Sequence, residues 1–154
     1  MVKHGWFWVA AGTGVLLDQL SKSWVGQNFG LGESWPLWAG VFHFTYVLNT
    51  GAAFSLFVQG TAWLRWLSVA VSAGLMALAV AGPRLAGREQ WGYGLILAGA
   101  VGNGIDRFRL GAVIDFLDVR WISFPIFNLA DVWINLGLVC LFWHYLRPHS
   151  SQNS

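Results

Sequence analysis

The stretch that decides the fold is WGYGLILAGAVGNGIDRFRL, residues 91–110. Its first part is apolar, and a helix of about 20 such residues crosses the ~30 Å hydrocarbon core of a bilayer. Its last part carries Asn103, Asp106 and Arg107, whose spacings of three and four place them on one helix face. Ionisable side chains at membrane depth are costly and usually mark a functional site. We therefore expect a membrane helix with a polar site at one end.

The composition agrees with an integral membrane protein. Of 154 residues, 56% are hydrophobic and only 10% are charged, which is unusual for a soluble domain. The length predicts one domain over 1–154. The net charge of +2 comes from scattered basic residues, so we expect no nucleic-acid partner. The single cysteine, Cys140, lies in an apolar run and is interpreted as a small buried hydrophobe.

Three more runs, 5–25, 62–81 and 128–146, are long enough to cross a bilayer. All four prolines fall outside these runs or at their edges, as helix boundaries require. The sequence therefore predicts an all-α membrane protein with four transmembrane helices. An even number of spans places both termini on one side. The basic residues are nearly balanced between the two sides, and only if Lys22, Arg107 and their basic neighbours belong to a site does the remaining bias favour cytoplasmic termini.

Two connectors, 26–60 and 111–127, lie outside the expected spans. Residues 41–47 alternate, with Phe42, Phe44 and Tyr46 on one face and His43 and Thr45 on the other, which is typical of a β-strand. Residues 112–121 are a second candidate strand. We expect a small sheet at one membrane surface. Because no other histidine lies near it in sequence, His43 is interpreted as solvated or hydrogen-bonded rather than as a metal ligand.

Small residues also recur in the third span, at Gly94, Ala98 and Gly102. A stripe of small residues at every fourth position lets two helices approach closely. We interpret this stripe as a packing surface without a chemical role. The polar tail 150–154 is expected to be disordered.

Polar residues gather at one end of several spans. They are Asp18, Lys22, Asn49, Asn103, Asp106, Arg107, Asp115, Asn128 and Asp131. Each pair alone has a structural explanation, such as an intrahelical ion pair or side chains that reach the interface. Their recurrence at one depth on several helices favours a shared site. Asp118 and Arg120 are interpreted as solvated loop charges.

Several carboxylates in one small site suit acid–base chemistry on a peptide bond. Like charges close together cannot both ionise cheaply, so one carboxyl keeps its proton while the other activates water. The serines lack a nearby histidine base, and Cys140 lies at the far end of its span. The glycine-rich run 99–104 is embedded in a span and does not form a phosphate-binding loop.

At these residues the sequence resembles the bacterial lipoprotein signal peptidases, also called signal peptidase II. Five blocks match in the family's order along nearly the whole chain. They are Asp18-Gln19-Leu20-Ser21-Lys22, Asn49-Thr50-Gly51-Ala52-Ala53-Phe54-Ser55, Gly102-Asn103-Gly104-Ile105-Asp106-Arg107, Val113-Ile114-Asp115-Phe116 and Phe124-Pro125-Ile126-Phe127-Asn128-Leu129-Ala130-Asp131. Each block alone is a weak signal, whereas five in order are specific.

The resemblance implies an aspartic endopeptidase of the bacterial inner membrane, with its active site at the periplasmic face and with globomycin as an inhibitor. Such enzymes remove the signal peptide of a prolipoprotein just before its diacylglyceryl-modified cysteine. By the family pattern, Asp115 and Asp131 form the catalytic dyad. The implied supporting or substrate-binding residues are Asp18, Lys22, Asn49, Gly51, Asn103, Asp106, Arg107 and Asn128. No metal and no cofactor are implied, and the block 49–55 belongs to a small periplasmic β-cradle that holds substrate.

The alternative is an intramembrane proton or ion translocator, because carboxylates within the membrane also build proton relays. A relay needs ionisable groups distributed through the membrane depth. The stretches 9–15, 71–81, 95–100 and 136–142 contain no charged residue, which favours the peptidase. The expected partners are lipidated prolipoproteins and membrane lipid, and we expect a monomer.

Overall fold

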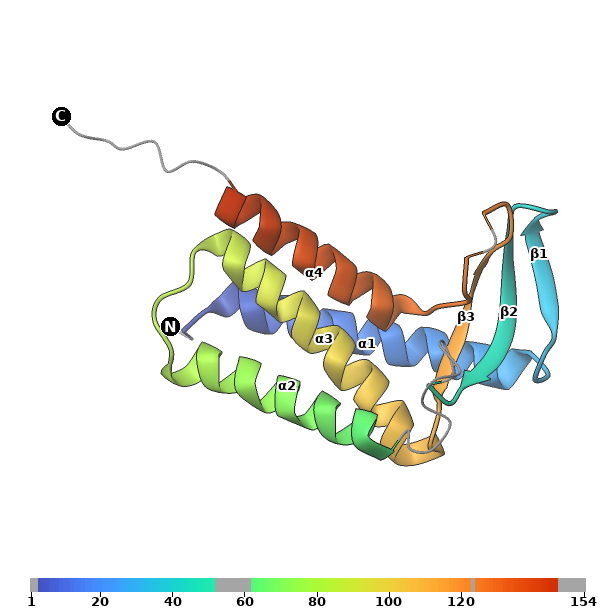
Figure 1. The fold of residues 1–154 in the computed structure, drawn as a ribbon, viewed down its shortest axis with the longest axis horizontal. Helices are drawn as coiled ribbons and strands as arrows, with labels where there is room; N and C mark the ends of the chain where they lie inside the picture. The colour runs from blue at the N-terminus through green and yellow to red at the C-terminus, as the bar shows by residue number, and fades with distance from the viewer. Residues whose placement is uncertain (1–2, 52–61, 123, 147–154) are drawn as a thin grey trace.

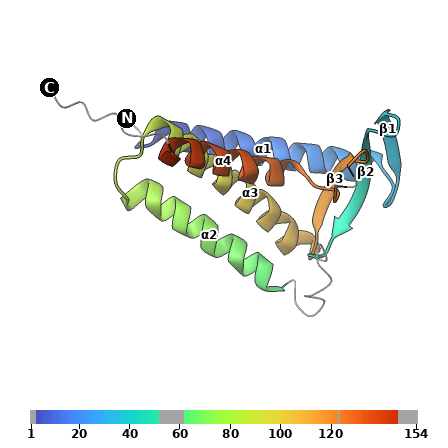
Figure 2. The same ribbon diagram turned by 45° about the horizontal axis from the view of Figure 1, so that its top comes forward.

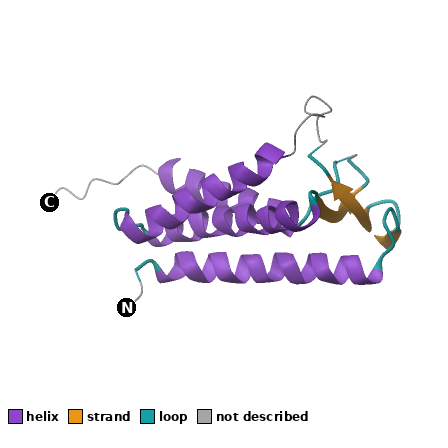
Figure 3. Cartoon of the chain, turned by 90° about the horizontal axis from the view of Figure 1, so that it is seen from below, coloured by secondary structure: helices purple, strands orange, loops and turns teal. Residues whose placement is uncertain are grey.

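The computed structural model describes residues 3–51, 62–122 and 124–146. Its elements are α1 (Gly5–Asn28), β1 (Ser34–Trp38), β2 (Phe42–Asn49), α2 (Ala62–Ala81), α3 (Gly87–Leu110), β3 (Val113–Val119) and α4 (Leu129–Leu146). The helices lie side by side, and the sheet lies across one end of the bundle (Figures 1 and 3). The start of α1 and the end of α4 lie at the opposite end (Figure 1). The architecture is therefore mostly helical with a small sheet.

The four predicted helices are present, the second with the predicted ends and the other three with shifted ends. The first continues to Asn28, the third begins at Gly87 and the fourth begins at Leu129. Two of them, Trp63–Ala81 and Leu129–Leu146, are long and apolar enough to cross a membrane by length and composition, with mean hydropathies of 1.7 and 1.4. Among the described helices α1 and α3, which carry the polar residues, do not pass this test. Predictions for residues 52–55 and 150–154 lie outside the described residues.

Three antiparallel strands form the sheet in the order β1-β2-β3. The two predicted strands are confirmed as β2 and β3, whereas β1 was not predicted. The connector after β3 turns back along that strand, because Phe127 exchanges backbone hydrogen bonds with Leu117 (2.8 and 3.1 Å). This return brings the beginning of α4 beside the first half of β3.

Helix α3 occupies the centre of the bundle and packs against α1, α2 and α4 (Figure 2). The predicted stripe of small residues is confirmed as a packing surface, and its partner is α1. A Cβ atom at Gly94 would lie 2.5 Å from the carbonyl oxygen of Phe7, and one at Gly14 would lie 2.6 Å from Cβ of Ala98. The helix backbones therefore approach closely only because these side chains are missing or small.

The interpretation of Asp118 as a solvated loop charge was wrong, whereas Arg120 lies exposed in the turn after β3, as expected. Asp118 lies in β3 with 7% of its surface exposed, and it accepts hydrogen bonds from Thr45 Oγ1 (2.6 Å) and Arg120 Nε (2.8 Å). The pairing of β3 with β2 buries it, and no sequence signal marks this pairing. His43 is hydrogen-bonded as expected, with Nδ1 3.2 Å from Ser34 Oγ.

Candidate active site

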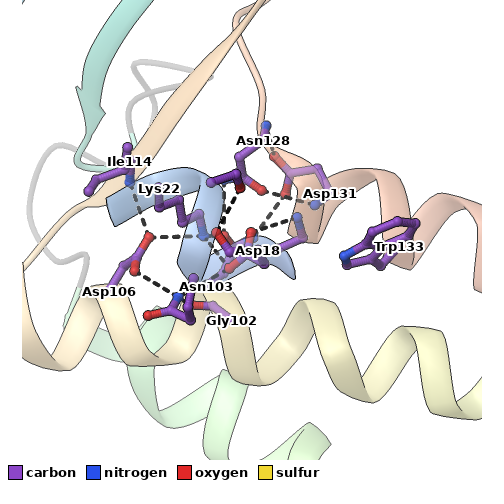
Figure 4. Close-up of polar contacts among 12 residues, drawn as sticks. Asp18, Lys22, Gly102, Asn103, Asp106, Ile114, Asn128, Asp131 and Trp133 are labelled. Atoms are coloured by element: carbon purple, nitrogen blue, oxygen red, sulfur yellow. Dashed lines mark hydrogen bonds and ion pairs between the residues drawn. The ribbon is translucent and has the colours of Figure 1, made fainter. Parts of the chain in front are cut away.

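The beginning of α4 is built from site residues. Asn128 Oδ1 accepts a hydrogen bond from the Asp131 backbone N–H (3.0 Å), and Asp131 Oδ2 accepts one from the Asn128 N–H (3.3 Å). This is a reciprocal cap of a helix N-terminus, with the acidic residue at the third helical position. The Ala130 N–H donates to Asp18 Oδ1 on α1 (2.9 Å; Figure 4). Backbone N–H groups at the start of the helix, which would otherwise be unpaired, therefore donate to side-chain oxygens of Asp18, Asn128 and Asp131.

Asp115 lies in β3 and is 2% exposed. Its Oδ2 accepts a hydrogen bond from Asn49 Nδ2 (2.8 Å), and its Oδ1 accepts one from Asn128 Nδ2 (2.6 Å). The Asn128 side chain thus binds Asp115 through its nitrogen while its oxygen binds the backbone of Asp131. A single amide joins the two predicted dyad residues.

Asp131 is held by a second amide. Asn103 Nδ2 donates to Asp131 Oδ1 (2.9 Å), while Asn103 Oδ1 accepts from Asn128 Nδ2 (3.1 Å) and from Lys22 Nζ (3.0 Å; Figure 4). Because an amide side chain has both donors and an acceptor, Asn103 links the dyad to the charged residues of α1 and α3.

Lys22 is 2% exposed and uses all three ammonium donors. It lies 2.9 Å from Asp18 Oδ2 and 2.9 Å from Asp106 Oδ2, and its third partner is Asn103. Gln19 Nε2 also lies close to both carboxylates, 3.1 Å from Asp18 Oδ2 and 3.2 Å from Asp106 Oδ1. A buried lysine needs such compensation because its charge is costly to remove from water.

Asp106 connects this charged cluster to the sheet. Its Oδ2 accepts the backbone N–H of Ile114 (3.2 Å), the residue before Asp115. Helix α3 ends at Leu110 and is capped by Gly111, whose φ of 71° is in the left-handed region that favours glycine, so the chain can turn directly into β3. The position of Asp115 therefore depends on how α3 ends.

The remaining predicted site residues lie at the margin of the cluster. The Gly51 N–H donates to Asn49 Oδ1 (2.8 Å), which turns the Asn49 nitrogen toward Asp115. Arg107 donates to Ser68 Oγ on α2 (3.3 Å) and makes no ion pair with a carboxylate of the described chain. Sequence reasoning missed Gln19 as a site residue, and its position between Asp18 and Lys22 was the available signal.

A cavity of about 640 Å³ opens beside the two aspartates. Its polar part is formed by Asn49, Asp115, Asp131 and Asn135. Its other walls come from the connector before α4 and from the exposed face of α4, and they are Phe124, Pro125, Ile126, Phe127, Val132, Leu136 and Val139. The arrangement suits an extended, mostly apolar chain that passes two carboxyl groups.

Burial raises the pKa of Asp115 from 3.8 to about 6. The negative charge of Asp131 acts in the same direction, whereas hydrogen bonds from Asn49 and Asn128 and the charge of Lys22 oppose it. The folded carboxyl holds its proton to about pH 6, while the unfolded one loses it near pH 3.8. Asp115 therefore lowers the free energy of unfolding as the pH rises through this window.

We expect the Asp131→Asn variant to titrate Asp115 at a lower pH than the parent. The substitution removes a nearby negative charge that favours the protonated form. Infrared difference spectra of the carboxylic acid C=O band would follow this proton, with Asp118→Asn as a control on the same strand. A midpoint that does not move would show that the two carboxyls do not interact.

We also expect Gly102→Ala to destabilise the fold by about 1–3 kcal/mol, the usual cost of overpacking. The added Cβ would collide with Asp18 Oδ2, which is paired with Lys22. The control is Gly74→Ala on α2, where nothing lies within 4 Å of the new atom. Thermal unfolding in one detergent should show a loss for the first variant and a small gain for the second. Equal melting temperatures would contradict the close packing at Gly102.

Fold and site together define a helical membrane enzyme. A solved bacterial membrane enzyme, determined by the in meso method at 2.3 Å resolution, superposes with a TM-score of 0.83 at 26% identity, over 95% of this chain and 90% of that one. The chain belongs to the signal peptidase (SPase) II family, whose sequence model matches residues 10–147. The lipoprotein signal peptidase of Synechocystis sp. is 61% identical over 153 residues, which cover 99% of this chain and 94% of that protein. The lipoprotein signal peptidase of Cyanothece sp. is 62% identical over 142 residues, 90% of this chain and 82% of that protein.

Proposed function

We propose that this chain removes the signal peptide from diacylglyceryl-modified prolipoproteins, cutting before the lipidated cysteine, with Asp115 and Asp131 as its catalytic dyad. Family membership supports the reaction. The observation that supports the dyad is the Asn128 side chain, which binds Asp115 at 2.6 Å and caps Asp131 at 3.0 Å beside a cavity. Globomycin is expected to occupy the same cavity.

In this mechanism a water molecule is held between the two carboxyls, which share one proton. The ionised member takes a proton from the water as the water attacks the scissile carbonyl carbon, and the protonated member donates to the carbonyl oxygen. One carboxyl then protonates the leaving amine. The titration belongs to the pair, so neither residue is assigned a fixed role.

The other site residues position this pair. Asn49 donates a hydrogen bond to one oxygen of Asp115 and Asn128 donates one to the other oxygen. Asn103 donates a hydrogen bond to Asp131. Lys22 holds Asn103 in turn. Because each carboxyl is held by hydrogen bonds that are already formed, the carboxyls meet the substrate without further reorganisation.

Cleavage of a purified precursor tests the function. The full chain in detergent is incubated with a diacylglyceryl-modified prolipoprotein, and with the same precursor without its lipid as the matched control. Mass spectrometry should show a new N-terminus at the lipidated cysteine in the first sample only. Cleavage elsewhere, or equal cleavage of both precursors, would contradict the proposed specificity.

We further propose that 1–154 form one integral membrane domain of the inner membrane, with all four helices spanning it and the sheet at the periplasmic face as the β-cradle. Long apolar side chains are exposed along α1 as well as along α2 and α4, as contact with lipid requires. The polar ends of α1 and α3 meet at the sheet, where Asp106 accepts the backbone N–H of Ile114. The expected partners are prolipoproteins and lipid, and the expected state is a monomer.

Cysteine labelling tests this topology. With Cys140 replaced by alanine, a cysteine at Gly87, the first residue of α3, should not react with a membrane-impermeant reagent applied from the periplasm. A cysteine at Leu31, exposed before β1, should react. Periplasmic labelling at Gly87 would overturn the orientation.

The translocator alternative finds no support in the fold. The charged residues of α1 and α3 that form the site all lie at the end next to the sheet, and the stretches 9–15 and 95–100 carry no charge. The charged residues of α1 and α3 that form the site are therefore confined to the end of the bundle next to the sheet and do not form a path along the helices.

A further inference from the structure

A second, elongated site lies outside the dyad cavity. Its apolar part is a groove of about 440 Å³ along α2 and α3, whose walls include Val69, Ala73, Met76, Val101 and Phe108. One residue at its boundary is cationic, Arg109, in the last turn of α3. None of the residues that line the groove also lines the dyad cavity.

Arg109 also lines a smaller polar cavity of about 190 Å³ between α1, β2 and α3. Gln19, Ser23 and Tyr46 contribute polar groups to it. It shares no residue with the dyad cavity either. The groove and the polar cavity therefore meet at Arg109, which lies between the apolar walls of the groove and the polar groups of the cavity.

The charge available to this site comes from Arg109. Within the described part of the chain Arg109 makes no hydrogen bond or ion pair, and neither does the Tyr46 hydroxyl. Lys22 and Asp106 border the polar cavity, but the lysine is shared by two carboxylates. Both Asp106 oxygens already accept hydrogen bonds or an ion pair. A cation without a partner among the described residues, beside the Tyr46 hydroxyl, suits an anionic oxygen.

We propose that the groove and the polar cavity together bind one anionic phospholipid, with an acyl chain along α2 and α3 and the phosphate at Arg109. The site matches such a lipid in polarity and in charge. The apolar groove would face the acyl chains of the bilayer, and it leads to the cationic Arg109 at the membrane surface. Basic side chains at this level attract anionic lipid. The site goes beyond the proposed peptidase activity, because it lies apart from the cavity that would receive the precursor.

Native mass spectrometry of the full chain in mild detergent tests the headgroup end. Phosphatidylglycerol and phosphatidylcholine with identical acyl chains are added in turn, and the fraction of protein that carries one lipid is measured. The parent should prefer phosphatidylglycerol. Arg109→Gln should weaken its binding about fivefold, as expected for one basic residue near the membrane surface. Arg109→Lys should keep the preference, and Arg88→Gln, at the other end of the same helix, should match the parent.

A second pair of variants tests the groove. Ala73→Phe fills it and should lower retention of both lipids, whereas Ala70→Phe, on the same helix but outside the lining, should not. Parent-like lipid binding by Arg109→Gln or by Ala73→Phe would overturn the proposal. So would displacement of the lipid by water-soluble glycerophosphoglycerol at equal concentration, which would exclude the acyl chain as a binding element. Displacement by a bound prolipoprotein would assign the groove to the substrate instead.

Discussion

Lys22→Met is expected to lower the free energy of unfolding by about 3–5 kcal/mol, the cost of breaking a buried ion pair, and to remove most of the cleavage activity. The ammonium group lies 2.9 Å from both Asp18 and Asp106, and its removal leaves two buried carboxylates without a counter-charge. It also releases Asn103, which holds Asp131. Methionine has a similar length, so the loss is of charge and hydrogen bonds rather than of volume.

The matched control is Lys3→Met at the other end of α1. Lys3 is an exposed donor to the carbonyl oxygens of Val80 and Gly82, so its loss should cost little. Arg107→Ala should lie between the two, because Arg107 binds Ser68 and lies near the carboxylates without an ion pair. Thermal unfolding and cleavage rates in one detergent would rank the variants. Parent-like stability and activity in Lys22→Met would show that the ion pairs of Lys22 neither stabilise the fold nor position the catalytic residues.

The helices were predictable because apolar runs of membrane length leave little choice of structure. Their ends were less predictable. Helix α1 continues to Asn28 beyond the expected span, and α4 begins where Asn128 and Asp131 cap each other. The start of α4 is set by these side-chain hydrogen bonds, and the end of α1 is closed by the Phe29 backbone N–H, which donates to the Val25 carbonyl oxygen. Hydropathy, on which the span prediction rests, detects neither.

The sheet was only partly predictable. The strand β2 follows from its alternation, whereas β1 contains Pro36 and exposed tryptophan and leucine side chains and shows no such pattern. Asp118 was misread because its burial comes from pairing across strands that are distant in sequence. A local pattern carries no information on such a pairing.

The position of each polar residue along its expected span was enough to predict that these residues converge. It was not enough to predict which of them form hydrogen bonds or ion pairs with one another. Spacing placed Asp18 with Lys22, yet the third partner of that ion pair, Asp106, lies on another helix. The linking roles of Asn103 and Asn128 likewise depend on three-dimensional contacts. Sequence resemblance pointed to these amides as supporting residues without showing what they bind.

Asp115→Asn and Asp131→Asn are each expected to reduce cleavage by about 10⁴-fold or more, in the range seen when a member of a catalytic unit is removed. Asparagine preserves the size of the side chain but cannot exchange a proton in the required way. Because the two carboxyls act as one unit, the double variant should be little worse than either single one. The matched control is Asp118→Asn on β3, a buried carboxylate outside the cavity, which should keep nearly full activity.

Single-turnover cleavage of a lipidated prolipoprotein by these variants, with precursor binding measured in the same samples, tests the dyad most directly. We predict that Asp115→Asn and Asp131→Asn still bind the precursor and globomycin, lose cleavage to a similar extent and show no further loss when combined. A single variant that cleaves at a rate close to that of the parent would contradict the dyad and make Asp18 or Asp106 the next candidate.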